Sequence, residues 1–125
     1  MNKAYLKELY NNAQGGDVLS STEIIMVMAY QKMEEYGHNW IGIGSCDKID
    51  GTELIEIMNK INVKEIYIER EWSNQFENWY KMQEAGLEMV GIRKIDNPAY
   101  QHDIKKWGNS TESETKTVLV FKIKE

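Results

Sequence analysis

The stretch from Gly42 to Thr52, GIGSCDKIDGT, holds the residues best suited to binding a ligand. Glycines at the end of an apolar segment let a ligand approach the backbone, and the loop after them can present backbone N–H groups to a phosphate. The same glycines can instead accommodate a bulge or a neighbouring helix. On the first interpretation, the cofactor-binding residues are Gly42, Gly44, Ser45, Lys48, Gly51 and Thr52.

Other reactive side chains give weaker patterns. Cys46 lies in the same loop, but a nucleophilic cysteine needs a lowered pKa and a base within reach, and the sequence places no base beside it. We therefore interpret Cys46 as an ordinary thiol. The two histidines, the single cysteine and the scattered acids show no metal-ligand spacing, so we predict no metal site.

Composition limits the class of protein. The 125 residues suffice for one domain with a real core, and 42% of them are hydrophobic. A formal net charge of −5 argues against a nucleic-acid-binding protein, which would show a basic face. The longest apolar run, residues 24–30, is too short to span a membrane. We expect no membrane partner, and a small-molecule or nucleotide-like ligand, a host protein or a second copy remain as candidate partners.

Cysteine and lysine usage bear on the source of the chain. One cysteine permits no internal disulfide, and the N-terminus lacks the apolar core of a signal peptide, so we expect a cytoplasmic protein. Lysine far outnumbers arginine, and asparagine, isoleucine and glutamate are abundant. This composition is typical of a low-GC bacterial genome or one of its phages or mobile elements.

The order of apolar patterns predicts an α/β fold in a single domain, residues 1–125. Two helices come first, at 3–13 and 20–36, the second with Ser20 and Glu23 as a capping box. Strands then alternate with helices, which implies right-handed crossovers, a three-layer arrangement and a largely parallel central sheet. The last strand follows the longest connection and is free to run antiparallel. The expected strands are 40–43, 63–70, 87–95 and 117–124, and the expected helices between them begin at 50, at 73 or 74, and at 97.

The phrase YKMQEAGLEMVGIR, residues 80–93, is similar to a segment of the GCN5-related N-acetyltransferase (GNAT) superfamily. That family carries an asparagine near a helix start, a tyrosine on the helix, a glycine, and a phrase of the type VGxR, followed by an apolar last strand. Asn74, Tyr80, Gly86 and the run 90–93 stand in those places, and VLVFKIK supplies the last strand. The resemblance covers residues 40–124 at most, and residues 1–38 have no counterpart.

The resemblance implies an acetyl-coenzyme A cofactor and transfer of the acetyl group to an amine. Tyr80 would be the general acid that protonates the departing thiolate. Glu69 or Glu71, at the end of a strand, or His102, in the long connection, would take the proton from the amine. Gly51 and neighbouring amides, with Lys48, would hold the phosphates.

Two features of the sequence depart from this family pattern. Glu53 lies where the family's phosphate loop has a glycine or alanine, and a carboxylate there repels a pyrophosphate. The N-terminal half of the family's sequence has no counterpart in residues 1–38 of this chain. Both departures favour an alternative class, a non-enzymatic accessory protein of a phage or mobile element that binds a host protein or sequesters a nucleotide-like signal. Trp72 and Trp107, near expected strand or loop ends, could then serve as anchors for a ligand or partner.

Overall fold

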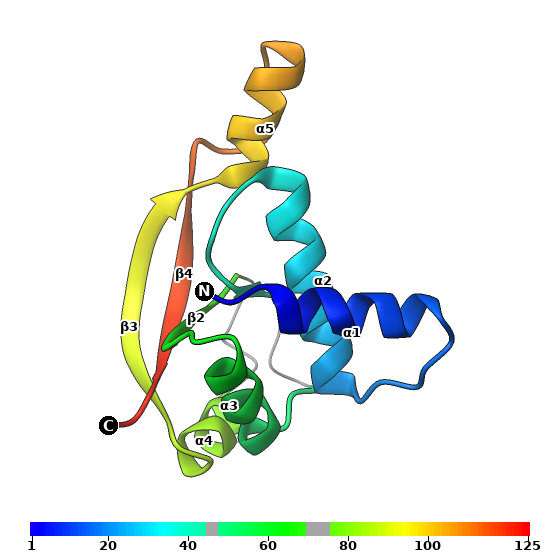
Figure 1. Ribbon diagram of the computed structural model, residues 1–125. Helices are drawn as coiled ribbons and strands as arrows, with labels where there is room; N and C mark the ends of the chain where they lie inside the picture. The colour runs from blue at the N-terminus through cyan, green and yellow to red at the C-terminus, as the bar shows by residue number, and fades with distance from the viewer. Residues whose placement is uncertain (45–47, 70–75) are drawn as a thin grey trace.

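The computed structural model describes residues 1–44, 48–69 and 76–125, with the side chains of residues 76–78 excepted. Within these residues the chain forms five helices and four strands, and the mixed α/β composition agrees with the prediction (Figure 1). In chain order they are α1 (Ala4–Gln14), α2 (Ser21–Tyr36), β1 (Gly42–Ile43), α3 (Gly51–Lys60), β2 (Glu65–Ile68), α4 (Phe76–Glu84), β3 (Leu87–Asp96), α5 (Pro98–Trp107) and β4 (Thr115–Ile123).

Helix α2 begins and ends as its sequence predicts. The Ser20 hydroxyl accepts a hydrogen bond from the Glu23 backbone N–H at 3.1 Å, and the Glu23 carboxylate accepts one from the Ser20 N–H at 2.9 Å. Gly37 ends the helix in the left-handed region, with φ of 75°, where glycine bears no steric cost. The capping box therefore fixes where α2 starts.

Helix α3 is capped by Asp50. The Asp50 carboxylate accepts a hydrogen bond from the Glu53 N–H at 3.0 Å. The Glu53 carboxylate accepts a hydrogen bond from the Ser20 hydroxyl. Glu53 thereby ties the start of α3 to the start of α2.

The sheet is mixed, so the expectation of a largely parallel sheet is corrected. Its order is β1-β2-β4-β3, with β1 and β2 parallel and β4 antiparallel to both neighbours. The chain returns from β3 through α5, in which no residue is buried, so α5 does not cover the sheet as a crossover helix would. The last strand therefore runs antiparallel and is inserted between β2 and β3.

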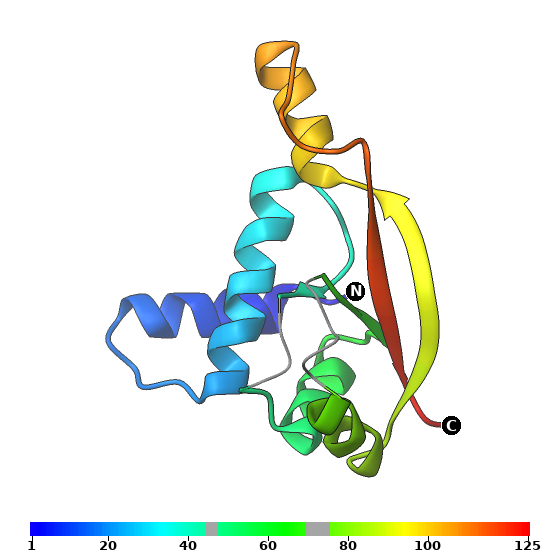
Figure 2. The ribbon, with the colours of Figure 1, turned by 180° about the vertical axis from the view of Figure 1, so that it is seen from behind.

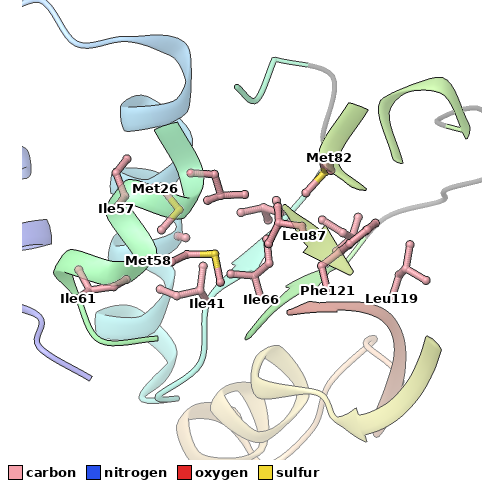
Figure 3. Close-up of a cluster of buried hydrophobic side chains, with 14 of the residues drawn as sticks. Met26, Ile41, Ile57, Met58, Ile61, Ile66, Met82, Leu87, Leu119 and Phe121 are labelled. Carbon is pink, nitrogen blue, oxygen red and sulfur yellow. The ribbon is translucent and has the colours of Figure 1, made fainter. Parts of the chain in front are cut away.

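Helices α1 to α4 contribute to one core on one side of the strands. Leu6, Met26, Met58 and Met82, one from each helix, belong to the same buried cluster as Phe121 of β4 (Figure 3). Figures 1 and 2 show these helices gathered to one side of β3 and β4, with α5 extending beyond the ends of the strands. The expected three-layer arrangement is not found among the described elements. In the part of the chain that is described, no helix has the length and apolarity needed to cross a membrane.

Candidate functional site

The candidate site is a hollow of about 610 Å³ at the C-terminal ends of the parallel strands β1 and β2. Ligands of open α/β sheets commonly bind at this end of parallel strands. Helix α2 forms one wall with Ile25, Met28, Ala29 and Lys32, and the strands and loops supply Gly42, Ile43, Gly44, Lys48, Glu69 and Lys116. The structure thus brings four of the predicted site residues together: Gly42, Gly44, Lys48 and Glu69.

Strand β1 presents an open backbone edge beside this hollow. Among the described strands it pairs only with β2, where the carbonyls of Ile41 and Ile43 accept hydrogen bonds from the N–H groups of Tyr67 and Glu69, at 2.9 and 2.8 Å. Backbone groups of successive strand residues point to opposite sides. The N–H and C=O of Gly42 therefore point away from β2, toward the free edge of the sheet.

Glu69 is the charged centre of the hollow. Its side chain is only 10% exposed, and Lys116 Nζ donates a hydrogen bond to Oε1 at 2.8 Å. Lys32 Nζ lies 3.8 Å from the other carboxylate oxygen, Oε2. A partly buried carboxylate requires such compensation, because burial removes its hydration. Glu69 in turn holds one lysine of β4 and one of α2 at the hollow.

Position 42 has no room for a side chain, because two neighbouring side chains occupy the space where a Cβ would be. A Cβ at this position would lie 2.5 Å from Glu69 Oε2 and 2.5 Å from the Trp40 ring. Trp40 also stacks on His38, with ring centroids 4.0 Å apart, and contacts Tyr67 at 5.1 Å. Close packing therefore explains this glycine at least as well as the approach of a ligand does.

At the start of α3, where a phosphate site was predicted, two backbone N–H groups are hydrogen-bonded within the protein. The Glu53 N–H is bonded to Asp50, and the Asp50 N–H donates to the Thr22 hydroxyl at 2.8 Å. Thr52 lines a separate hollow of about 440 Å³ with Glu23, Asp50, Glu53 and Glu56, whose carboxylates repel phosphate. A Cβ on Gly51 would lie 2.6 Å from the Ala85 Cβ, so this glycine lets α4 pack against α3.

The remaining predicted residues lie elsewhere. Tyr80 is 62% exposed on α4 and is not among the residues that line the hollow. His102 lies on α5 against Tyr36, with ring centroids 5.2 Å apart, and lines a third hollow between α2 and α5. Ser45, Cys46, Glu71, Trp72 and Asn74 fall outside the described residues. Trp107, at the end of α5, is 63% exposed.

The sequence did not indicate that Lys32 and Lys116 would be site residues. Both are far from Glu69 in the chain; Lys32 lies in a helix whose apolar residues gave the dominant signal, and Lys116 precedes the expected strand 117–124, whereas β4 begins at Thr115. The alternation of β4 could have indicated that Lys116 and Val118 share a face, but the antiparallel register that brings this face to Glu69 was not predictable. These lysines change the site from a glycine loop to a cationic hollow.

In comparisons with known proteins, no protein-family model, no curated protein and no solved structure matches this chain. Among the described residues, no group of three or more histidine, cysteine or acidic side chains is placed to hold a metal ion. What the site can do therefore follows from the chemistry of its described residues: an open backbone edge, an apolar wall, and Lys32, Lys48 and Lys116 beside Glu69 in one hollow.

The close contact at Gly42 can be tested by substitution. Gly42→Ala should lower the free energy of unfolding by about 1–3 kcal/mol, because the added methyl group must displace the Glu69 carboxylate from its lysines or move the Trp40 ring. Gly15→Ala is the matched control, since a Cβ there meets its nearest atoms at 3.5 Å and the backbone is helical. Urea denaturation measures both; equal stabilities for the two variants would contradict the packing described at Gly42.

His38 gives the fold a pH dependence of defined sign. Burial lowers the pKa of His38 below the usual 6.5 of a histidine, against the raising effects of its hydrogen bond with the Trp40 carbonyl and of the Glu69 charge. The unfolded chain therefore binds the proton more readily, and the stability due to neutral His38 is present above pH 6.5 and lost as pH falls through the folded-state pKa.

We expect His38→Gln to reduce the loss of stability between about pH 7.5 and about pH 5.5 relative to the unaltered chain. Urea denaturation at the two pH values gives this difference. A variant whose pH dependence is the same as that of the unaltered chain would show that burial of neutral His38 does not contribute.

Proposed function

We propose that the protein binds an anionic small molecule of the acyl-coenzyme A type in the hollow at the ends of β1 and β2. The observation that carries this proposal is the presence of Lys32, Lys48 and Lys116 around one hollow of an otherwise acidic chain. Among the described residues that line the hollow, three ammonium groups and the carboxylate of Glu69 give a local excess of positive charge. That excess favours phosphate or another anion.

The other walls suit the neutral part of such a ligand. The pantetheine arm of coenzyme A is a chain of amides and methylenes, and the open edge of β1 at Gly42 offers one donor and one acceptor to an amide. Ile25 and Met28 provide apolar contact on the opposite wall. A hollow of about 610 Å³ is within the range of small-molecule sites, which supports occupancy by part of the cofactor.

Acetyl transfer is the more specific part of the proposal. The amine nitrogen would attack the thioester carbonyl, the thiolate of coenzyme A would leave and be protonated, and the amine would lose one proton. Glu69 is the predicted acid–base residue that lines the hollow, but both of its oxygens contact lysines. In this structure Glu69 is a positioning residue that keeps two cations at the site.

The position of Tyr80 and His102 favours a second candidate function. Neither lines the hollow, so the predicted acid and one predicted base are away from the bound anion. A site that binds an anion away from Tyr80 and His102, with Glu69 held by lysines, would suit a protein that sequesters a coenzyme A or nucleotide-like molecule, as expected of a phage or mobile-element accessory protein. Both candidates share the same hollow and the same cations.

Ligand-induced stabilisation tests whether an anionic ligand binds in the hollow, which both candidate functions require. Acetyl-coenzyme A at about a hundred times its dissociation constant should raise the free energy of unfolding by about 2.7 kcal/mol. Lys48→Ala should raise the dissociation constant about fivefold, which is about 1 kcal/mol for one exposed charged contact. Lys64→Ala is the matched control, because this exposed lysine precedes β2 at the other end of the strand.

A comparison of several ligands distinguishes acetyl transfer from sequestration. Stabilisation by acetyl-coenzyme A, with release of free thiol when amines such as lysine or a polyamine are added, would support the transferase. Stabilisation by nucleoside diphosphates, coenzyme A or acetyl-coenzyme A, with no free thiol released from acetyl-coenzyme A when the same amines are added, would support sequestration. No stabilisation by either class of ligand, or equal weakening by the two lysine variants, would contradict binding in this hollow.

A further inference from the structure

Strand β3 forms the other edge of the sheet, opposite β1, and leaves apolar side chains exposed. It is ten residues long and pairs only with β4 among the described strands. Met89, Val90 and Ile92 are 40%, 50% and 60% exposed. Long exposed edge strands readily pair with other chains. We propose that β3 pairs antiparallel with β3 of a second copy, which joins two sheets edge to edge.

A bulge in β3 determines which side chains share a face. Met89 is opposite Phe121 and Gly91 is opposite Val120, so Val90 has no partner in β4. Directly opposite residues of a ladder point to the same face. Phe121 and Leu119 both belong to the core, so Met89 and Ile92, which are opposite them, point to the core side of the sheet.

The charged residues lie on the other face. Glu88 is opposite Lys122, and Arg93 is opposite Val118. Without the bulge, Glu88 and Arg93 would point to opposite faces, because they are five residues apart in a structure with a period of two. With Val90 as the extra residue, they share one face.

This arrangement is self-complementary about Gly91. A two-fold axis beside Gly91 would bring Met89 opposite the partner's Ile92, and Glu88 opposite the partner's Arg93, each contact occurring twice. Such a symmetric interface is the usual form of a homodimer. Shifting the pairing by two residues, the smallest shift that keeps the faces, removes both ion pairs. The charges therefore select one register and favour a second copy over an unrelated strand.

The proposed pairs extend contacts that already exist within the chain. Arg93 donates a hydrogen bond to Glu65 at 2.8 Å, and Glu88 lies 3.9 Å from Lys122. These four side chains remain between 41% and 53% exposed, so they have room for a further partner. Pairing would connect them across the interface as an alternating row of charges. The cationic hollow lies at the β1 edge and stays open in the dimer, so this inference does not rest on the proposed ligand.

Mixed charge-reversal variants test both the dimer and its register. In a homodimer, Glu88→Arg places arginine opposite arginine twice, and Arg93→Glu places glutamate opposite glutamate twice. Each variant alone should raise the dimer dissociation constant about tenfold or more. An equimolar mixture should form a heterodimer, because both cross-strand pairs then have opposite charges.

Light scattering after size exclusion, over a series of protein concentrations, measures the mass of each sample. The unaltered chain and Glu8→Arg, a charge reversal at an exposed residue of α1, should remain dimeric. Ile92→Lys should be monomeric and folded, because Ile92 is 60% exposed in the monomer and the lysine meets solvent there. If repulsion from Glu65 prevents Arg93→Glu from folding, Ile92→Lys serves as the disrupting variant in its place.

Three results would overturn the proposal. They are a monomeric unaltered chain at every concentration, an unchanged dimer in Glu88→Arg or Ile92→Lys, and a folded pair of charge variants that stays monomeric when mixed. Circular dichroism of each variant establishes that it is folded.

Discussion

The arrangement around the hollow depends on the charge of Glu69. This carboxylate comes directly after β2, lies over Gly42 of β1 and is contacted by lysines of α2 and β4. Removing a carboxylate from water is costly unless opposite charges compensate it. Glu69 therefore joins an N-terminal helix, the parallel strand pair and the last strand at one point, and the absence of a side chain at Gly42 makes the space for it.

This constraint relates the two parts of the chain to a single site. Residues 40–124, where the GNAT resemblance lies, supply the parallel strands and the antiparallel last strand. Helix α2, which has no counterpart in that resemblance, supplies an apolar wall and Lys32. A ligand in the hollow would thus contact both parts. Tyr80 and His102 lie away from the hollow, so neither would contact a ligand bound there.

Interactions between residues close in the chain predicted the helices and strands well. The strand order and part of the site depend on pairing between residues far apart in the chain. Ser20, Glu23 and Gly37 fix the ends of α2 through bonds within a few residues, so the sequence predicts them directly. The strand order depends on where β4 is inserted, and alternation within a strand carries no information about its neighbour. Gly42, Gly44, Lys48 and Glu69 were predicted because strand ends are local features. Lys32 and Lys116 were not, because only the tertiary fold brings them to Glu69.

The most direct test is a titration of the isotopically labelled protein with acetyl-coenzyme A, followed by the backbone amide resonances in nuclear magnetic resonance spectra. Binding in the hollow should shift the amides of Gly42 and Gly44 together with that of Lys116, while those of Gly91 and Gly108, in the β3 edge and after α5, stay in place. Saturable shifts confined to residues outside the hollow, or no shift at any ligand concentration, would contradict the account.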